Sequence, residues 1–529
     1  LLNLAAFEVR FEERRPFFQE GVGLFKCGGP CEGIFYTRRI GRTPQLRASS
    51  LDPSGTSILG AAKLTGRLRS GMALGLVEAI TRREEGVNGA TIEPQTNYFV
   101  GRLVKEMRQG RSQIGTMVGA VNRNLDPATE PYLRRAAYTG VLQGFHRFAR
   151  DRWEVMAYTG INQVSGSREA IARTQLNSVH FYQRPDHEES FDSTRTTLGG
   201  NVAAVSLSKI GGAVRWNTYV RRASAGLELN DLGFVPTVND ASIRNDLVWQ
   251  ALRPGRFYRR MFANFGAENH WTTGGLPSGG RVVGQATWEL PNSWLTTFSY
   301  TGNDLFQTHC VACARGGPAV RQGPKHDFAF VVSGDPRLVL VPRVTLAAGF
   351  GDDRRSYGYA LIGGADLRIA SRFSMGVDGQ YIHRNDDQQW IGNFGSSVSD
   401  TTHFTFAHLE QTTLSVTGRV NWTASPTLSL QLYAQPFVSS GDFDDWRELA
   451  DPRAARYVDR YRPYGGRRVP DGFSYKQFNS NAVVRWEYRP GSTLFLVWQQ
   501  GRVNDRVNRP GFEFARDYRD LFRAHPDNT

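Results

Sequence analysis

The chain has 529 residues, a formal net charge of +14 and a pI near 9.8, and 40% of its residues are hydrophobic. Its mean hydropathy of -0.42 and the lack of any apolar run of about 18 residues exclude transmembrane helices. They do not exclude a membrane, because a transmembrane β-strand needs an apolar side chain only at every second position over about ten residues.

The positive charge is carried almost entirely by arginine, since only six of the 64 basic residues are lysine. A guanidinium forms two-point contacts with carboxylates and phosphates, so the excess fits anionic lipid headgroups, a charged lumen or nucleic acid. Codon usage in a GC-rich genome is an equally good explanation. Nucleic acid is disfavoured because the arginines are spread along the chain and no RNA- or DNA-binding motif concentrates them.

Residues 1–56 are too charged and too often interrupted by Gly and Pro to form lipid-facing strands. We expect this segment to be a lead-in or a plug that fills a lumen, and residues 57–529 to form the barrel described below. An ordinary polar periplasmic lead-in is the alternative. The plug candidates, whose charges could pair with lumen charges, are Glu12, Glu13, Arg14, Arg15, Arg38, Arg39 and Arg42.

From residue 58 onward, segments of about nine to twelve residues alternate apolar and polar side chains, the length that a tilted strand needs to cross a bilayer. They cover residues 58–68, 72–81, 96–107, 112–123, 197–208, 211–222, 256–268, 281–290, 292–302, 325–333, 338–349, 356–369, 372–384, 402–422, 427–437, 478–488 and 492–500, together with "YTGVLQGFHRF" and "WEVMAYTGINQV". Soluble strands average five or six residues. The pattern is therefore typical of a membrane sheet.

The clearest hairpin is "TTLSVTGRVNWTASPTLSLQLYAQPF", residues 412–437. Because strand side chains alternate between faces, we assign its apolar residues to the face that contacts lipid and its polar residues to the face that lines the lumen. The lipid-facing set is Leu414, Val416, Val420, Trp422, Leu428, Leu430 and Leu432, and the lumen-facing set is Ser415, Thr417, Arg419, Asn421, Ser429 and Gln431.

Tight turns such as Pro490-Gly491 contrast with long polar stretches at 383–400 and 438–472. This asymmetry is typical of outer-membrane barrels, with short periplasmic turns and long extracellular loops. Aromatic residues near strand ends, such as Tyr98, Trp216 and Trp486, fit interfacial girdles. We predict an all-β fold: a large closed antiparallel transmembrane β-barrel of about 22–26 strands, plugged because a lumen of that width would leak.

Four cysteines form two local pairs, Cys27 with Cys31 and Cys310 with Cys313. Two short disulfides of an extracytoplasmic protein are the favoured interpretation. A zinc site that includes His309 is the alternative, although it would require two distant loops to meet. Haem attachment is excluded because Ala314 stands where the histidine ligand should follow the second cysteine.

Several motifs, among them "RPFFQEGVGLF", "EPQTNYFVGRL", "IGTMVGAVNR" and "TTLSVTGRVNWTASPTLSLQLYAQPFVSSGDF", resemble the outer-membrane barrel domain that follows a carbohydrate-binding-module family nine-like domain in Gram-negative bacteria. The similarity runs from about residue 7 to residue 500. The resemblance implies an outer-membrane location, a C-terminal barrel and an upstream β-sandwich module. We expect that module, and a closing final strand, to lie outside this sequence. The resemblance supplies no catalytic residues.

Enzyme signatures such as GxSxG, HExxH or a Walker loop are absent from the sequence, so we predict neither an enzyme nor a cofactor. His383, Asp386 and Asp387 are grouped in one stretch, but such a group is usually solvated surface. Calcium is a weak alternative for the acidic stretch that contains Asp442, Asp444 and Asp445, because that stretch lacks the glycine turn of an EF-hand.

Two functions from different classes follow for this multi-pass outer-membrane protein. The first is a plugged channel, transporter or receptor for an unidentified, glycan-related substrate. The second is a non-conducting anchor or assembly scaffold for a periplasmic or extracellular protein. The expected partners are outer-membrane lipid and lipopolysaccharide, with no nucleic acid. A soluble β-propeller or solenoid is disfavoured because the sequence has no repeat of 40 to 50 residues.

Overall fold

The chain is built on a 22-stranded antiparallel sheet, and two small two-stranded sheets lie in its loops. The structure is a computed structural model that describes residues 8–25, 33–395, 402–466, 470–506 and 511–528. No helix among these residues is long and apolar enough to cross a membrane. The prediction of an all-β antiparallel fold is thus confirmed.

The strands follow one another in chain order. Those of the first half are β1 (Ile58–Arg67), β2 (Met72–Thr81), β3 (Glu84–Glu85), β4 (Thr91–Glu93), β5 (Gln95–Met107), β6 (Ser112–Asn124), β7 (Ala136–Phe148), β8 (Trp153–Ser165), β9 (Thr197–Lys209), β10 (Val214–Ala223), β11 (Asp240–Ala251), β12 (Arg260–Trp271) and β13 (Pro277–Glu289). Those of the second half are β14 (Leu295–Asn303), β15 (Thr308–Cys310), β16 (Val320–Gln322), β17 (Lys325–Ser333), β18 (Leu340–Gly351), β19 (Ser356–Ala370), β20 (Phe373–Phe394), β21 (His403–Ser425), β22 (Leu428–Leu449), β23 (Tyr461–Pro463), β24 (Gly472–Arg489), β25 (Ser492–Arg506) and β26 (Pro526–Asn528).

The helices are short and lie in the segments that precede, connect or follow the strands. They are α1 (Pro16–Gln19), α2 (Val22–Phe25), α3 (Arg168–Leu176), α4 (Tyr457–Arg460) and α5 (Phe514–Arg523), with two 3-10 turns, η2 (Thr37–Arg39) and η3 (Asp352–Arg354). Ser167 caps α3, since its hydroxyl accepts a hydrogen bond from the Ala170 amide at 3.1 Å.

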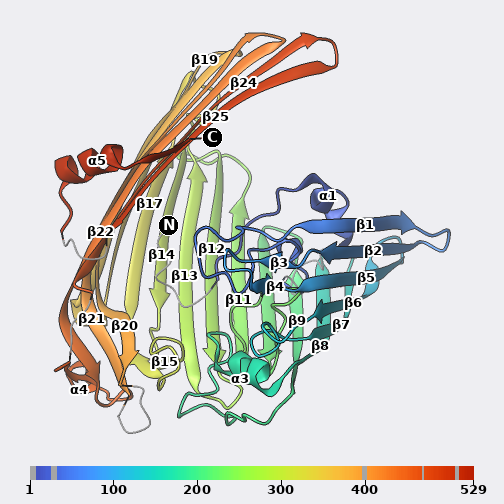
Figure 1. Ribbon diagram of the computed structural model, residues 1–529. Coiled ribbons are helices and arrows are strands. Elements are labelled where there is room, and N and C mark those ends of the chain that lie inside the picture. Colours follow the sequence, from blue (N-terminus) through green and yellow to red (C-terminus); the bar gives the residue numbers. More distant parts are fainter. Residues whose placement is uncertain (1–7, 26–32, 396–401, 467–469, 507–510, 529) are drawn as a thin grey trace.

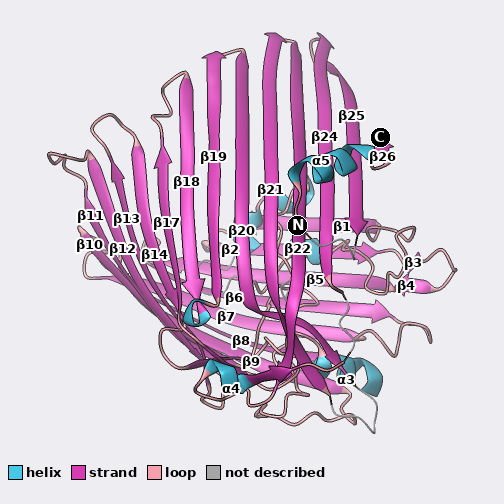
Figure 2. Cartoon of the chain, turned by 90° about the vertical axis from the view of Figure 1, so that its left-hand side faces the viewer, coloured by secondary structure: helices cyan, strands magenta, loops and turns pink. Residues whose placement is uncertain are grey.

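Each long strand pairs with the next long strand along the chain, from β1–β2 through β24–β25. The short strands β3–β4 and β15–β16 form the two separate small sheets, while β23 pairs with the far end of β22. Figure 1 shows β1 to β9 running across the view and β11 to β25 running from bottom to top, so the sheet bends into a trough. Figure 2 shows β18 to β25 side by side as one wall of it.

The sheet is open, so the prediction of a closed transmembrane barrel is wrong. Among the described residues, β1 is hydrogen-bonded to β2 alone, and β25 is hydrogen-bonded to β24 and, over Gln500–Arg502, to β26. No ladder joins β1 to β25, which leaves the sheet with two edges. Closure depends on where the two end strands of the sheet lie relative to each other, and the alternation within each strand carries no information about that.

Two stretches expected to be loops extend strands instead. Residues His383–Phe394 belong to β20 and Val438–Leu449 belong to β22, so that β20, β21 and β22 are each 22 or 23 residues long. The main hydrophobic core lies in the bend of the trough, between the concave face of β2 to β9 and the segments that cover it.

Candidate functional site

The convex face of the sheet carries a continuous apolar surface. Cross-strand register places side chains from six neighbouring strands, β14 and β17 to β21, in one row, and the two rows beside it add Phe328, Tyr359, Val332 and Val344 among smaller and polar residues. The row is Phe298, Phe330, Leu346, Leu361, Tyr381 and Leu414. Leu346 and Leu361 are each about half exposed, at 50% and 51%. Water-soluble proteins rarely leave so long an apolar surface open.

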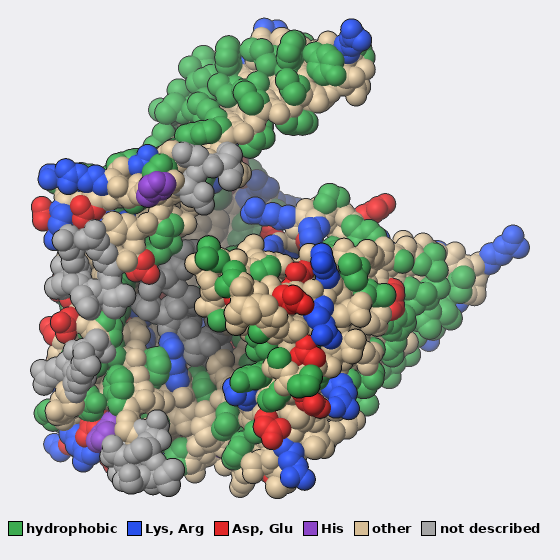
Figure 3. All heavy atoms as spheres, in the orientation of Figure 1, with side chains coloured by type: hydrophobic (Ala, Val, Ile, Leu, Met, Phe, Trp, Pro, Cys, Tyr) green, Lys and Arg blue, Asp and Glu red, His purple; other side chains and the backbone are tan. Residues whose placement is uncertain are grey.

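Large aromatic side chains end this surface near the tight turns of the second half. Trp422, Trp486 and Tyr488 are 48%, 47% and 54% exposed. In Figure 3, hydrophobic side chains dominate the visible surface of the arm formed by the ends of β19, β24 and β25. Tyr98, by contrast, lies on the concave face and is 2% exposed, so it belongs to the core and to no girdle.

The two residue sets assigned to the 412–437 hairpin lie on opposite faces of the sheet. Val420 pairs with Leu432, and Trp422 with Leu430, on the convex face. Asn421 pairs with Gln431 on the concave face. The remaining convex-face members are Leu414, Val416 and Leu428, and the remaining concave-face members are Ser415, Thr417, Arg419 and Ser429.

The concave face of the second half is polar and charged. Arg343 on β18 forms ion pairs with Asp366 and, at 2.8 Å, with Asp378. Gly364 makes room for this contact, because a Cβ at that position would meet the Asp378 carboxylate at 2.2 Å. The glycine thus allows the carboxylate to lie across β19 and reach the guanidinium two strands away.

Two pockets lie along the concave face of β11 to β20. One, of about 370 Å³, is lined by charged and amide side chains that include Arg244, Glu268, Arg281 and Gln285. The other, of about 500 Å³, has small residues such as Ala347 on its floor. Lys325, Asp327, Arg384 and Asp386 contribute its charges. Both are suited to a polar ligand with hydrogen-bonding groups of either sign.

The concave face of β2 to β9 is covered by other parts of the chain. Phe18, Phe25, Ile34 and Ile40 pack in the core with apolar side chains of β2 to β9. Residues 8–25 and 33–56 therefore lie against the inner surface of this part of the trough (Figure 1).

The charged plug candidates fall into groups with different partners. Glu13 pairs with Arg15 at 2.6 Å, and Arg38 donates to the carbonyl of Glu12, all within the segment itself. Two arginines reach outside it. Arg39 donates to the Gly233 carbonyl at 2.7 Å, and Arg42 lies 4.0 Å from Glu93.

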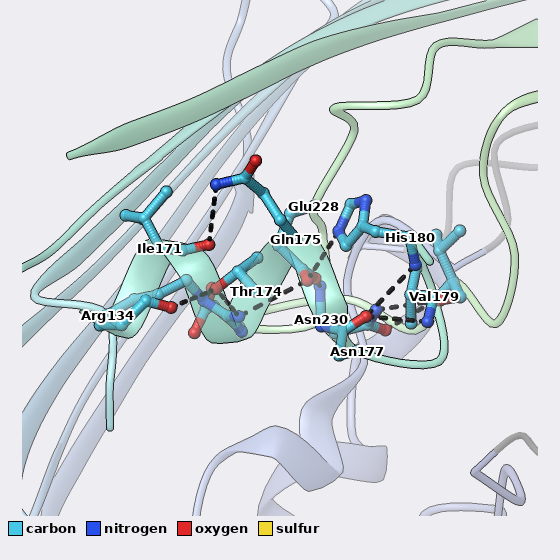
Figure 4. A network of polar contacts seen from close by, with 12 residues as sticks. Arg134, Ile171, Thr174, Gln175, Asn177, Val179, His180, Glu228 and Asn230 are labelled. Atoms are coloured by element: carbon cyan, nitrogen blue, oxygen red, sulfur yellow. Dashed lines mark hydrogen bonds and ion pairs between the residues drawn. The ribbon is translucent and has the colours of Figure 1, made fainter. Parts of the chain in front are cut away.

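A buried ionic network fixes the loop between β10 and β11 to this covered face. Asp231 accepts from Arg123 on β6 and from Arg134, each at 2.7 Å. Glu228 lies 3.2 Å from His180 and 3.5 Å from Arg134. Figure 4 shows the side chains of Arg134 and His180 reaching Glu228 from opposite sides, next to α3.

This network holds its acids in the ionised form. Burial alone would raise the pKa of Glu228, but the Arg134 charge and the His180 hydrogen bond outweigh it, and the pKa falls to about 2. The pKa of Asp231 is lowered in the same way by Arg134 and Arg123, against the effect of burial. Sequence reasoning missed this site because its partners lie in four separate segments.

A second polar cluster lies at the long-loop end, and it contains part of the acidic group noted in the sequence. Asp387 receives hydrogen bonds from His408 at 3.1 Å, Arg447 at 3.0 Å and Tyr457 at 2.7 Å. His383 instead lies 3.3 Å from Thr412, and Asp386 pairs with Arg384. The structure therefore does not bring the three residues together, and the Asp387 cluster joins β20, β21, β22 and α4 through a fully bonded carboxylate.

The cysteine and acidic candidates have separate outcomes. Cys310 and Cys313 form a disulfide, whereas Cys27 and Cys31 lie outside the described residues. Asp442 accepts a hydrogen bond from the Gly511 amide at 2.7 Å, and Asp445 lies 3.4 Å from Arg447. Within the described ranges, no group of three or more His, Cys, Asp or Glu side chains has metal-binding geometry. Asp444 therefore belongs to no such group among these residues.

One further feature escaped the sequence analysis. Helix α5 lies against the convex face of β22, β24 and β25, just beyond the apolar surface. Its signal in the sequence is the aromatic spacing Phe514, Tyr518, Phe522, which places three rings on one flank of a helix.

Together the fold and these surfaces define a class of protein: an all-β chain whose open sheet is apolar on its convex face and polar, in part self-covered, on its concave face. Comparison with protein families assigns the particular family. Residues 1–529 match a domain of unknown function, DUF5916, and the chain belongs to that family. No curated protein matches the chain closely enough to add to this assignment.

Proposed function

We propose that this protein is a transporter or receptor in the outer membrane of a Gram-negative bacterium. Its convex face contacts lipid, and its concave face binds a polar substrate. The observation that carries the proposal is the apolar row that crosses strand after strand of the convex face. The open sheet described above replaces the closed barrel as the structural basis of this function.

The dimensions of the apolar surface support the membrane location. On β24, convex-face positions from Phe478 to Trp486 are flanked by the charged Lys476 on one side and by the turn after Arg489 on the other. Eight residues at about 3.3 Å each, tilted by about 40°, span about 20 Å. This is close to the apolar band of about 25 Å that membrane sheets present to lipid.

The polar concave face supports transport or reception. Its two pockets offer carboxylates, guanidinium groups and amides within the same hollow, the groups that bind hydroxyl-rich molecules by paired hydrogen bonds. A glycan-related substrate fits both this chemistry and the carbohydrate-binding neighbour that the sequence resemblance implies. Residues 8–25 and 33–56, which cover the concave face of β2 to β9, supply the plug that a conducting path would require.

A non-conducting scaffold is the second candidate, and the two unpaired edges favour it. Unsatisfied backbone groups are costly in lipid, so β1 and the free part of β25 need a neighbouring strand there. Each of these edges can accept an amphipathic strand of a protein partner. This arrangement fits an assembly role.

Two experiments test these proposals in turn. The purified full chain should require detergent or lipid to remain monodisperse, and a chain that stays monodisperse in plain buffer would refute the membrane location. In a planar bilayer, conductance that changes on addition of oligosaccharides supports the transporter. Silence in the bilayer, combined with cross-links between a partner and a cysteine placed at Leu59 of β1, supports the scaffold.

A further inference from the structure

Helix α5 is fixed to the convex face by contacts that involve its two aspartate side chains. Lys476 of β24 lies 3.2 Å from Asp517, and these two side chains are 1% and 0% exposed. Leu521 is also fully buried. The second carboxylate of this side, Asp520, lies 3.9 Å from the same ammonium group. Arg516 of the helix also pairs with Asp517, at 3.1 Å, so both aspartates face cationic groups on the sheet side of α5.

Further contacts hold both ends of the helix. At its start, the Asp517 carboxylate accepts from the Glu513 amide at 2.8 Å, which satisfies a free N–H of the first turn. At its end, Arg502 of β25 donates to the carbonyls of Phe522 and Ala524. A guanidinium at a helix C-terminus also complements the helix dipole. These contacts at both ends, together with the Lys476–Asp517 pair, fix the orientation of α5 on the sheet.

The remaining two sides of α5 have different chemistry. One flank carries Phe514, Tyr518 and Phe522, and the Phe522 ring packs on Phe478 with centroids 5.3 Å apart. Phe478 lies two residues closer than Lys476 to the apolar surface of β24, so this flank is turned toward that surface. Phe514 and Phe522 are nevertheless 58% and 48% exposed.

The side opposite the sheet is basic. Arg519 and Arg523 are exposed there, four residues apart on the helix. In Figure 3, Lys and Arg side chains gather at the outer end of the segment that Figure 1 labels α5. Half-exposed aromatic rings beside an exposed row of arginines are the pattern of a helix that lies in a membrane interface.

We propose that α5 is an interfacial anchor that binds an anionic lipid surface, with Phe514 and Phe522 among the upper acyl chains and Arg519 and Arg523 on the headgroup phosphates. This inference rests on the proposed membrane location. The charge complementarity is one-sided, because Lys476 and Arg516 pair with the aspartates on the sheet side, whereas Arg519 and Arg523 are exposed. The position of α5 where the convex face changes from apolar to polar agrees with this assignment.

A depth measurement tests the proposal. Single cysteines replace Phe522, Leu432 of the central apolar surface, or Leu51, which is 79% exposed in a loop. Each variant of the full chain carries a nitroxide and is reconstituted in vesicles of phosphatidylcholine with about 30% phosphatidylglycerol, and the chain without an engineered cysteine gives the background. Accessibility to oxygen and to a water-soluble nickel complex then gives the depth. We expect Leu432→Cys deep, Phe522→Cys at headgroup level and Leu51→Cys in water.

The outcomes separate the two proposals. If the label at position 432 is deep and the label at 522 is as accessible to nickel as the label at 51, the interfacial anchor is refuted and the membrane location stands. If the label at 432 is also in water, both proposals fail.

The arginines are tested by amide hydrogen exchange of α5 in the reconstituted protein. Each Lys or Arg side chain near an anionic membrane raises the affinity of the protein for that membrane about five-fold. Protection of α5 should therefore rise by more than ten-fold from pure phosphatidylcholine to the anionic vesicles. R519Q/R523Q should abolish this rise while leaving the Lys476–Asp517 pair intact. An equal rise in the variant would contradict the role of the arginines.

Discussion

The buried network around Asp231 gives the sharpest prediction about stability. The substitution Asp231→Asn keeps the shape of the side chain but removes the charge shared by Arg123 and Arg134, each 2.7 Å away. The Asp231 and Arg123 side chains are 2% and 1% exposed, so water cannot replace the lost partner. Breaking a buried ion pair from one side costs about 3–5 kcal/mol. The amide oxygen still accepts one hydrogen bond, so we expect the lower end, about 3 kcal/mol.

A matched control lies at the start of the same covered region. Glu130→Gln breaks the ion pair between Glu130 and Arg135, whose two side chains are 46% and 64% exposed respectively. An ion pair this exposed contributes less than about 1 kcal/mol to stability. Both variants are compared with the wild type by urea unfolding in lipid vesicles and by hydrogen exchange of residues 224–239. If Asp231→Asn costs no more than Glu130→Gln, the network does not hold this loop and our account of the covered face is refuted.

Two other predictions follow from the same surfaces. The pKa of Glu228 is lowered from 4.5 to about 2 in the folded protein, so its stabilisation is complete above pH 4.5 and is lost as the pH falls toward 2. Protection of the 224–239 loop from exchange should fall over that range, and a flat profile would contradict the assignment. Gly364→Val should displace Asp378 from Arg343 and destabilise the sheet by about 1–3 kcal/mol. The control Gly284→Val should cost less, because a Cβ at position 284 meets nothing within 4 Å. Equal losses of stability in urea unfolding would count against the Arg343–Asp378 contact.

The local structure of this chain could be predicted well where alternation is strict. Strand β2 begins and ends at the predicted residues 72 and 81. The prediction failed at β20, which continues from 384 to Phe394, because its pairing with β21 shifts register between Asp386 and Gln389 and again between Trp390 and Gly392. Such bulges redirect side chains and interrupt the two-residue period on which strand prediction depends.

Other features required information that no local pattern carries. Strand β11 was missed because its central residues, "IRNDLVW", place polar side chains on both faces. The open edges reflect how the twist of many strands adds up, and the partners of Asp231 come from distant loops. The apolar contacts of the N-terminal segment through Phe18 and Ile40 were not identified from the sequence, because the charged residues around them gave no periodic pattern.

The most direct test of the membrane location compares two neighbouring positions of β22. Leu432 lies in the middle of the convex apolar surface and is 40% exposed, and Gln431 lies on the concave face. We predict that Leu432→Arg lowers the free energy of unfolding from vesicles by about 2–4 kcal/mol, and that Gln431→Arg changes it by less than about 1 kcal/mol. Equal tolerance of arginine at both positions would show that lipid does not contact the convex face.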